Sequence, residues 1–375
     1  MTIGSTPTAG MEAILGLMPL NLYLGREAVK ARWRTKNLIT SNKWDGVGKI
    51  PTRKGHKRCL DDILGSIGAS DQDCIPCTSM RLDLLNIENF DLAVYTDGSK
   101  DEMGVGSGWA ITKGDHVLDE DSFQLPAHAT VFQAEVLAIA EAAKAVAGNK
   151  KYENLTVEIR SDSQAAIAAI NCKNVRSKAV KEAVSELQTL SKQTTVNLRW
   201  IKGHNGTTGN ELADCLAKRG TTCPNKKGAG KPASKIKNDI NDRYQKKWCE
   251  AWSKRTDCKI TRFFYPKPGN WFTMKRIVKL SRLKITKLVQ AATGHGLFAA
   301  HLAHWRPCQK VCTLCQESEQ TSAHLWAECP ALCLERMNLI VDQRPLNYEL
   351  NIIKFFDDQR IQKNLLKNLG EGSLN

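Results

Sequence analysis

The chain has 375 residues, of which 42% are hydrophobic and 25% charged, a composition that is ordinary for a folded protein and excludes wholesale disorder. Its net charge of +15 is uneven, because residues 221–310 hold 21 Lys and Arg against 4 Asp and Glu, a local charge of +17. Such a basic block favours a polyanionic partner over acidic lipid or a merely solvated surface.

The N-terminal region predicts a helix followed by a polar, basic loop. Residues 11–35 have amphipathic helical spacing and residues 36–58 do not, so we expect residues 1–89 to form a connecting segment. The apolar stretch at residues 11–24 lacks a basic leader and is interrupted by Glu12, Pro19 and Asn21. We therefore expect neither a signal peptide nor a membrane span, and no membrane partner.

Residues 90–220 predict a regular α/β layer. Strands are expected at "FDLAVYTDGS", "VGSGWAIT" and "HVLDEDSFQL", a helix at "TVFQAEVLAIAEAAKAV" and a fourth strand at "LTVEIRS". Helices at "SQAAIAAI" and "KAVKEAVSELQTL", a strand at "TVNLRWIK" and a helix at "GNELADCLAK" complete the order. This order predicts a mixed sheet with flanking helices.

Four acids stand where these elements could bring them together. If the first and fourth strands are adjacent and parallel, Asp97 and Asp162 end side by side, and Glu135 faces them from the first long helix. Asp214 lies in the last helix. Carboxylates so close together repel one another, and a divalent cation would neutralise this repulsion. Hard oxygen ligands select Mg²⁺ or Mn²⁺, and two such ions would activate a water molecule for displacement at a phosphoryl group. Taken singly, each acid would be read as a turn former, a cap or a surface charge.

The motifs "YTDGS", "FQAEVLAI", "RSDSQAAI" and "WIKGHNGTTGNELADCLAK", in this order, resemble a type 1 ribonuclease H domain over residues 90–220. The resemblance implies a five-stranded sheet and an endonuclease that hydrolyses the RNA strand of RNA–DNA hybrids. It implies that two Mg²⁺ ions are held by Asp97, Glu135, Asp162 and Asp214. It also implies that the histidine of the "GHNGTTGNE" loop, His204, assists proton transfer or product release. Hybrid contacts are implied for Gly98, Ser99, Gln133, Ser163 and Asn210.

The C-terminal region predicts a basic helical segment with a zinc site. Residues 221–239 are rich in Gly, Pro and Lys, so we expect a basic flexible linker there, which could also serve as a nuclear signal. Residues 240–345 are expected to be mainly helical and to bind RNA or DNA, although their aromatic residues could equally form a core. A C-terminal tail would follow at residues 346–375.

A cysteine and histidine cluster within this region has the spacing of a structural metal site. The sequence has thirteen cysteines and no recognisable secretory signal, so we expect an intracellular protein, either nuclear or cytoplasmic. In that environment the cysteines are expected to be reduced thiols or metal ligands rather than disulfides. One Zn²⁺ is predicted on the set with spacing CxxC, H and C, namely Cys312, Cys315, His324 and Cys329. A less familiar set is disfavoured as a zinc site: His56, Cys59, Cys74 and Cys77.

The flanks resemble the C-terminal part of a non-LTR retrotransposon polyprotein of the Jockey or I type. The resemblance rests on "PTAGMEAILGLMPLNLYLGREAVKARWR", "LVQAATGHGLFAAHL" and the CCHC cluster around the ribonuclease H motifs. It implies a role in reverse transcription, a fragment or truncated copy of a polyprotein, and an upstream reverse transcriptase domain as a partner. The alternative is a catalytically idle nucleic-acid-binding remnant that acts through the basic segment and the zinc cluster.

Overall fold

The computed structural model describes residues 7–39, 60, 62–82, 89–203, 206–269, 271–341 and 348–368. The chain divides into two compact units, which we call the sheet unit, residues 28–240, and the helical unit, residues 1–27 with 241–375. The expected N-terminal segment of residues 1–89 is thus shared between the two. Among the described residues, no helix combines the length and the apolar character that crossing a membrane would require.

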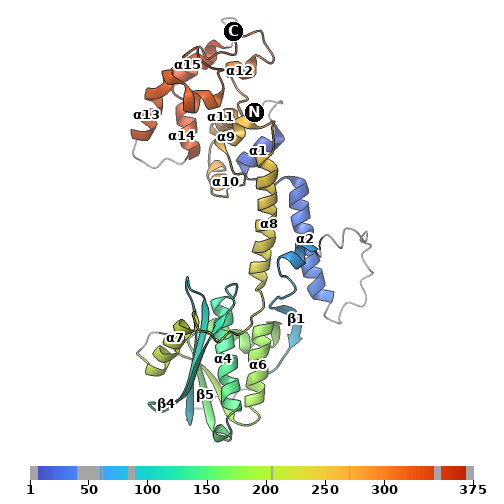
Figure 1. Ribbon diagram of the computed structural model, residues 1–375, viewed down its shortest axis with the longest axis vertical. Helices are drawn as coiled ribbons and strands as arrows, with labels where there is room; N and C mark the ends of the chain where they lie inside the picture. The colour runs from blue at the N-terminus through green and yellow to red at the C-terminus, as the bar shows by residue number, and fades with distance from the viewer. Residues whose placement is uncertain are drawn as a thin grey trace. The chain divides into compact units, whose positions relative to one another are not determined.

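The sheet unit is built on a five-stranded mixed sheet, as predicted (Figure 1). The strand order is β4-β3-β2-β5-β7, with antiparallel pairs from β4 to β2 and parallel pairs from β2 to β7. The expectation that the first and fourth strands are parallel neighbours is confirmed by the pairing of β2 with β5. The strands are β2 (Leu92–Lys100), β3 (Val105–Lys113), β4 (His116–Leu125), β5 (Thr156–Ser161) and β7 (Thr195–Trp200).

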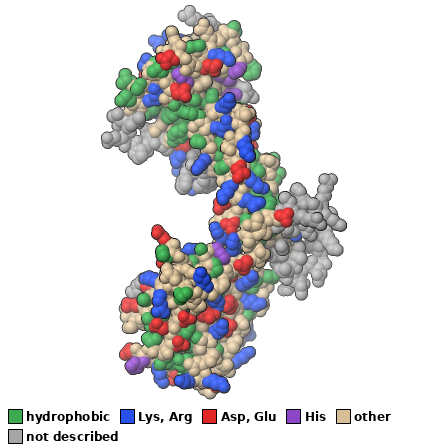
Figure 2. Space-filling model, in the orientation of Figure 1, with side chains coloured by type: hydrophobic (Ala, Val, Ile, Leu, Met, Phe, Trp, Pro, Cys, Tyr) green, Lys and Arg blue, Asp and Glu red, His purple; other side chains and the backbone are tan. Residues whose placement is uncertain are grey.

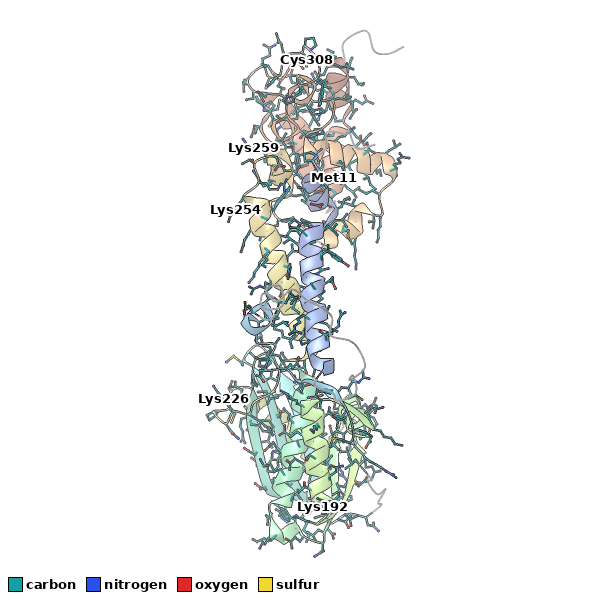
Figure 3. The ribbon with its side chains drawn as sticks, turned by 90° about the vertical axis from the view of Figure 1, so that its right-hand side faces the viewer. Met11, Lys192, Lys226, Lys254, Lys259 and Cys308 are labelled. Atoms are coloured by element: carbon teal, nitrogen blue, oxygen red, sulfur yellow. The ribbon has the colours of Figure 1, made fainter. Side chains whose placement is uncertain are left out.

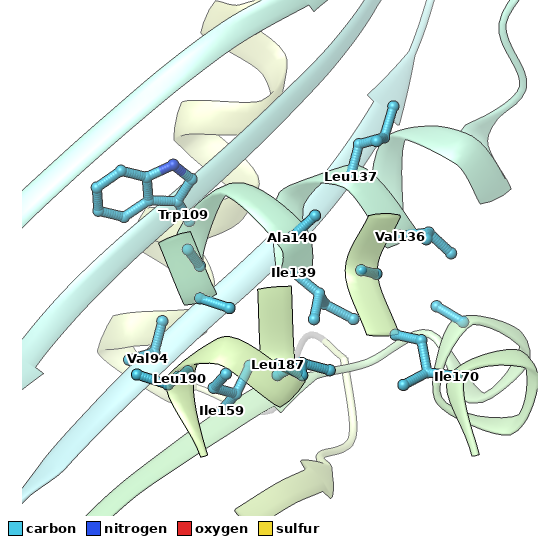
Figure 4. Packing of buried hydrophobic residues seen from close by; sticks show 14 of the residues in the cluster. Val94, Trp109, Val136, Leu137, Ile139, Ala140, Ile159, Ile170, Leu187 and Leu190 are labelled. Atoms are coloured by element: carbon cyan, nitrogen blue, oxygen red, sulfur yellow. The ribbon is translucent and has the colours of Figure 1, made fainter. Parts of the chain in front are cut away.

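Helices pack on this sheet through an apolar core that includes Val94, Ile139, Ile159 and Leu187 (Figure 4). Helix α4 contributes most, because its alanine-rich sequence is buried along most of its length. It begins at a capping box, in which the Thr130 hydroxyl accepts from the Gln133 backbone N–H and the Gln133 side chain accepts from that of Thr130. The helices are α4 (Val131–Ala147), α5 (Gln164–Ile170), α6 (Lys178–Leu190) and α7 (Thr208–Gly220), with a short 3₁₀ turn η1 (Lys150–Tyr152).

A second, two-stranded sheet was not predicted. Strand β1 (Cys74–Ser79) pairs antiparallel with β6 (Asn174–Ser177), so residues before the expected domain boundary belong to the sheet unit. Both strands are short, and Pro76 interrupts the sequence pattern of β1, which explains why propensity did not indicate it. Cys74 and Cys77 lie in this strand, whereas His56 and Cys59 of the disfavoured zinc set fall outside the described residues.

The segment that we expected to be a flexible linker is fixed by hydrogen bonds along residues 221–231. The backbone of Gln124 in β4 donates to Asn225 and accepts from Lys227. The ammonium group of Lys227 forms ion pairs with Glu141 of α4 and Glu182 of α6, while its neighbour Lys226 is exposed (Figure 3). The composition suits a linker, but these tertiary partners are far away in sequence and hold the segment as a strap on the sheet unit.

The helical unit contains the predicted basic helices and a core of its own. The expected helix at residues 11–35 is two helices, because Gly16 adopts a left-handed conformation with φ 66° and Pro19 follows it. Helix α2 begins in the helical unit and ends in the sheet unit, whereas α8 begins in the sheet unit and ends in the helical unit. The first helices are α1 (Thr8–Leu15), α2 (Leu20–Ile39), α8 (Ala233–Ser253), α9 (Lys259–Phe264) and α10 (Trp271–Ile277). The remainder are α11 (Arg282–Thr293), α12 (Ala299–Leu302), α13 (Cys333–Val341), α14 (Tyr348–Phe356) and α15 (Gln359–Lys367), with the short turns η2 (His324–Glu328) and η3 (Pro330–Leu332).

Most aromatic residues of the basic segment that the structure describes serve this core. Trp248, Trp252, Phe264 and Tyr265 are buried, and the Trp252 indole N–H donates to the Tyr265 carbonyl over 2.9 Å. They are therefore packing residues and are not available to stack on bases. Lys and Arg side chains are numerous on the surface along α8 (Figure 2).

Candidate active site and cysteine–histidine cluster

Three carboxylates from different elements meet at one edge of the main sheet. Asp97 lies near the end of β2, Asp162 directly follows β5, and Glu135 projects from the second turn of α4. One carboxylate oxygen from each lies within 4.8 Å of the others. The parallel pairing of β2 with β5 brings the two aspartates to the same edge, and the packing of α4 on the sheet supplies the glutamate.

The close approach of α4 to β2 depends on Gly98. A Cβ atom at this position would lie 2.5 Å from the Glu135 backbone nitrogen and 2.9 Å from the Ala134 side chain. Any larger residue would force the helix away from the strand, and Glu135 with it. The Gly98 backbone N–H also donates to Asp97 Oδ1 over 2.8 Å, which orients that carboxylate.

The electrostatics of the cluster favour uptake of a cation or of protons. Burial, followed by the charges of Asp97 and Asp162, raises the pKa of Glu135 from 4.5 to about 9. Burial also raises the pKa of Asp97 from 3.8 to about 6, with Asp162 and Asp214 adding to the effect. Glu135 Oε2 is buried and has no hydrogen-bond partner. A divalent cation would supply the missing partner and neutralise the repulsion, so the residues present fit one.

The fourth acid, Asp214, adjoins the cluster from α7. Its charge acts on Asp97, but it is not among the three carboxylates that lie within 4.8 Å of one another. Instead Asp214 Oδ2 accepts a hydrogen bond from the Lys218 ammonium group over 2.7 Å, one helical turn along. Sequence reasoning missed Lys218, although the separation of four residues is a recognisable signal for an ion pair on a helix.

The structure distributes the other predicted site residues unevenly. Gly98, Ser99 and Ser163 are partly exposed, and the Ser163 hydroxyl caps α5 by accepting from the Ala166 N–H. Gln133 is 1% exposed, and its amide group donates to the Gly230 carbonyl of the strap over 2.9 Å. The Gln133 side chain therefore faces its own chain in this conformation.

Two further predictions have different outcomes. Asn210 is 6% exposed, and its side-chain oxygen is buried without a partner. His204 and the neighbouring Asn205 fall outside the described residues. The role of the loop histidine thus stays a prediction.

A basic pocket near Asp162 was not predicted from the sequence. It has a volume of about 360 Å³ and is lined by Arg160, Arg199, Trp200, Ile201, Lys202 and Thr207. The Trp200 indole N–H donates to the Asp162 carbonyl over 2.9 Å, which joins the pocket to the carboxylate cluster. Arg160 and Arg199 both pair with Glu158, whose side chain is 1% exposed. The available signal was Arg199 near the end of β7, followed by Lys202 just beyond the strand.

Comparison with known proteins agrees with this geometry. A family model described as RNase H matches residues 89–222. The ribonuclease H of Cupriavidus pinatubonensis is 32% identical over 143 residues, covering 35% of this chain and 94% of that protein. That of Polynucleobacter asymbioticus is 31% identical over 147 residues, covering 34% and 88%. The chain belongs to the ribonuclease H family.

This ribonuclease H domain is an enzyme domain of the class that hydrolyses RNA in RNA–DNA hybrids. Among solved structures, that of LC11-RNase H1 in complex with an RNA/DNA hybrid is 20% identical, with a TM-score of 0.29, and the match covers 34% of this chain and 96% of that one. The matched residues lie within the sheet unit, and the helical unit is not part of the family match.

The helical unit brings together the four residues that were predicted to bind zinc. Their ligand atoms all lie within 4.8 Å of one another, and Cys315 Sγ is 3.3 Å from His324 Nε2. The members are Cys312, Cys315, His324 and Cys329. Neither Cys308 nor Cys333, which flank the predicted set, is part of this group among the described residues.

The donor set of this cluster fits one tetrahedral Zn²⁺. Cys312 and Cys329 are fully buried, and burial together with the neighbouring Cys312 raises the pKa of Cys329 to about 12. Buried thiols without a cation keep their protons, whereas Zn²⁺ stabilises the thiolates. His324 directs Nε2 toward Cys315, while its Nδ1 lies 3.6 Å from Glu328 Oε2. A carboxylate on the far side of a ligating imidazole is a common arrangement around zinc.

Proposed function

We propose that residues 89–222 cleave the RNA strand of RNA–DNA hybrids by two-metal-ion catalysis, with Mg²⁺ or Mn²⁺ held by Asp97, Glu135, Asp162 and Asp214. The observation that carries the proposal is the cluster of three carboxylates, of which Glu135 has a buried oxygen without a partner. A structural cluster of acids would be stabilised by lysine, arginine or hydrogen-bond donors. Here the three carboxylates repel one another, which favours a site for cations.

Each residue of the proposed site has a distinct task. Glu135 supplies the most buried carboxylate, and the close contact at Gly98 fixes its position. Asp97 and Asp162 are held by the strand ends, and Asp214 supplies a ligand when it exchanges its contact with Lys218 for the metal. When bound, the two ions would lower the pKa of a water and neutralise charge on the scissile phosphate. His204 would move a proton during the reaction or during product release.

The hybrid is proposed to lie across the edge of the sheet that carries these acids. Gly98, Ser99 and Ser163 are exposed enough to contact it, and the pocket around Arg199 and Lys202 would hold a backbone phosphate. Contacts from Gln133 and Asn210, which the resemblance implies, would require these buried side chains to turn outward.

The proposal is tested with Asp97→Asn in the full chain. The amide preserves shape but removes the charge that a metal needs, so cleavage of a labelled RNA–DNA hybrid in Mg²⁺ should be lost, whereas hybrid affinity should be retained. Asp119→Asn is the matched control, because Asp119 is an exposed carboxylate on β4 that lies outside the cluster. Cleavage by Asp97→Asn at the wild-type rate would overturn the assignment.

The wider role is also proposed. The basic segment and a Zn²⁺ on the CCHC cluster would bind RNA or DNA, and the chain would serve retrotransposon reverse transcription together with an upstream reverse transcriptase domain, inside the cell. The support is the high positive charge of the segment and the geometry of the cluster. The complete set of four acids favours an active nuclease over an idle binding remnant.

A further inference from the structure

A pocket of about 310 Å³ lies in the helical unit beside the cysteine–histidine cluster. Its floor is formed by Phe298 and Thr293, which are buried, and its rim by exposed side chains. The volume is at the lower end of the range of about 300 to 1,000 Å³ that holds small ligands. The lining includes His295, His301, His304, Trp305, Lys310 and Glu319.

The rim combines an aromatic surface with hydrogen-bond donors. Trp305 is 69% exposed, in contrast to Trp248 and Trp252 of the same unit, which are buried in the core. Lys310 provides a cation on the rim. An indole that remains in water beside a hollow of this size is suited to stack on a flat ligand.

The histidines line the pocket on the side of the loop between α11 and α12. The rings of His295 and His301 lie 4.8 Å apart, and His301 Nδ1 is 3.0 Å from the Gly296 carbonyl. When Nδ1 donates to that carbonyl, the imidazole ring is held in place in the wall of the pocket. Imidazole, ammonium and indole groups together suit a ligand in which an anionic group is attached to an aromatic ring.

A metal ion is a poorer occupant than a nucleotide. Among the described residues, two groups of three or more possible metal ligands have their atoms within 4.8 Å of one another, namely the CCHC cluster and the carboxylate triad. The pocket histidines belong to neither group. The surrounding charge favours an anion, because residues 241–310 hold 16 Lys and Arg against 3 Asp and Glu, a net charge of +13.

We propose that this pocket binds one unpaired nucleotide of a single-stranded nucleic acid, with Trp305 stacked on the base and Lys310 beside the phosphate. The proposal rests on the nucleic-acid role assigned above to the basic segment, and it names the residues that distinguish a single strand from a duplex. A base within a duplex is already stacked on both faces and cannot reach the indole.

The cysteine–histidine cluster supports one wall of this pocket. The Gln320 backbone N–H donates to the Lys310 carbonyl over 2.8 Å, and the Cys312 N–H donates to the Ser318 carbonyl over 2.7 Å. The same Gln320 accepts at its side chain from the Ala299 N–H over 3.1 Å, which joins the wall to α12. Residues 310–321 therefore carry two members of the cluster, Cys312 and Cys315, and also contribute to the lining of the pocket.

The test measures binding of fluorescein-labelled oligothymidylate, oligouridylate and a matching duplex to the full chain by anisotropy. Trp305→Ala should weaken binding of one or both single strands by roughly five- to a hundred-fold, the range expected for loss of one stacking contact. Trp305→Phe should restore most of the affinity. Leu334→Ala is the matched control, because Leu334 is 68% exposed in the same unit and does not line the pocket.

Each outcome decides a separate point. Wild-type affinity of Trp305→Ala for both single strands, or an equal loss of duplex binding, would overturn the pocket proposal alone. If the wild-type chain binds no single strand at low salt, the proposed role of the basic segment fails as well. Cleavage of the hybrid by the wild-type chain is scored separately, because it tests the ribonuclease activity and not the pocket. Zinc content and circular dichroism of each variant show that the fold is retained.

Discussion

Replacing Glu135 with glutamine tests whether the carboxylate cluster is built for a cation. Without a bound cation, burial and the charges of Asp97 and Asp162 raise the pKa of Glu135 from 4.5 to about 9. The folded protein therefore keeps this proton at neutral pH, whereas the unfolded chain releases it. The resulting stabilisation is complete below pH 4.5 and is lost as the pH rises toward 9.

The expected magnitude follows from the proton linkage. One bound proton changes the free energy of unfolding by about 1.4 kcal/mol per pH unit, so the sheet unit of the metal-free wild type should lose roughly 3 kcal/mol between about pH 6.5 and 8.5. The variant Glu135→Gln has no proton to release and should lack this part of the slope. Asp97, with a pKa of about 6, contributes little in this window.

Hydrogen exchange of α4 and β5 amides in the full chain, corrected for intrinsic rates, reports the stability of the sheet unit alone. Glu153→Gln is the control, because Glu153 is an exposed glutamate of the same unit outside the cluster. Saturating Mg²⁺ should reduce the difference between the wild type and Glu135→Gln, since the metal displaces the proton. Equal pH slopes for the two metal-free proteins would refute the reasoning.

Three further changes test the carboxylate cluster, the cysteine–histidine cluster and the helical unit separately. Lys218→Met removes the cation that pairs with Asp214, so half-maximal cleavage should need less Mg²⁺ in a titration; an increased requirement would contradict this pairing as a competitor. Cys315→Ser should abolish binding of one Zn²⁺, measured by metal analysis, while hybrid cleavage persists; unchanged zinc content would exclude the cluster as the site. Arg276 pairs with Glu349 over 2.8 Å, and the Glu349 side chain is 1% exposed. Arg276→Leu removes this partner and should lower the free energy of unfolding of the helical unit by about 3 to 5 kcal/mol in denaturant melts. A decrease below about 1 kcal/mol would show that Glu349 is paired elsewhere.

The positions of three acids were predictable because each follows from a regular element. Asp97 lies near the end of β2 and Asp162 directly follows β5, and strands that run parallel in one sheet end at the same edge. Glu135 lies among apolar residues of a strongly helical sequence, so the face that packs on the sheet must carry it. The sequence could not predict that the Glu135 Oε2 atom has no hydrogen-bond partner, because this depends on the three-dimensional surroundings of a single oxygen.

Side-chain partners explain most of the differences from the sequence predictions. Gln133 was assigned to the hybrid by resemblance, but its amide is used by the capping box and by Gly230, which lies 97 residues along the chain. On composition alone, the aromatic residues near α8 and α9 could have been core or surface; most of them are buried in the helical unit, whereas Phe263 is exposed. Trp305, which stays exposed, did not stand out in the sequence pattern.

The strap at residues 221–231 shows most clearly why composition alone is insufficient. Gly, Pro and Lys predict a chain without a regular element, and the strap indeed has none of its own. Flexibility does not follow, because the Lys227 ammonium group meets two carboxylates, and the Gly230 carbonyl accepts the Gln133 amide beside the start of α4. Since α4 carries Glu135, contacts that hold its first turn also help to hold the edge of the sheet that carries the carboxylate cluster. The residues that were expected to form a linker are therefore a part of the folded sheet unit.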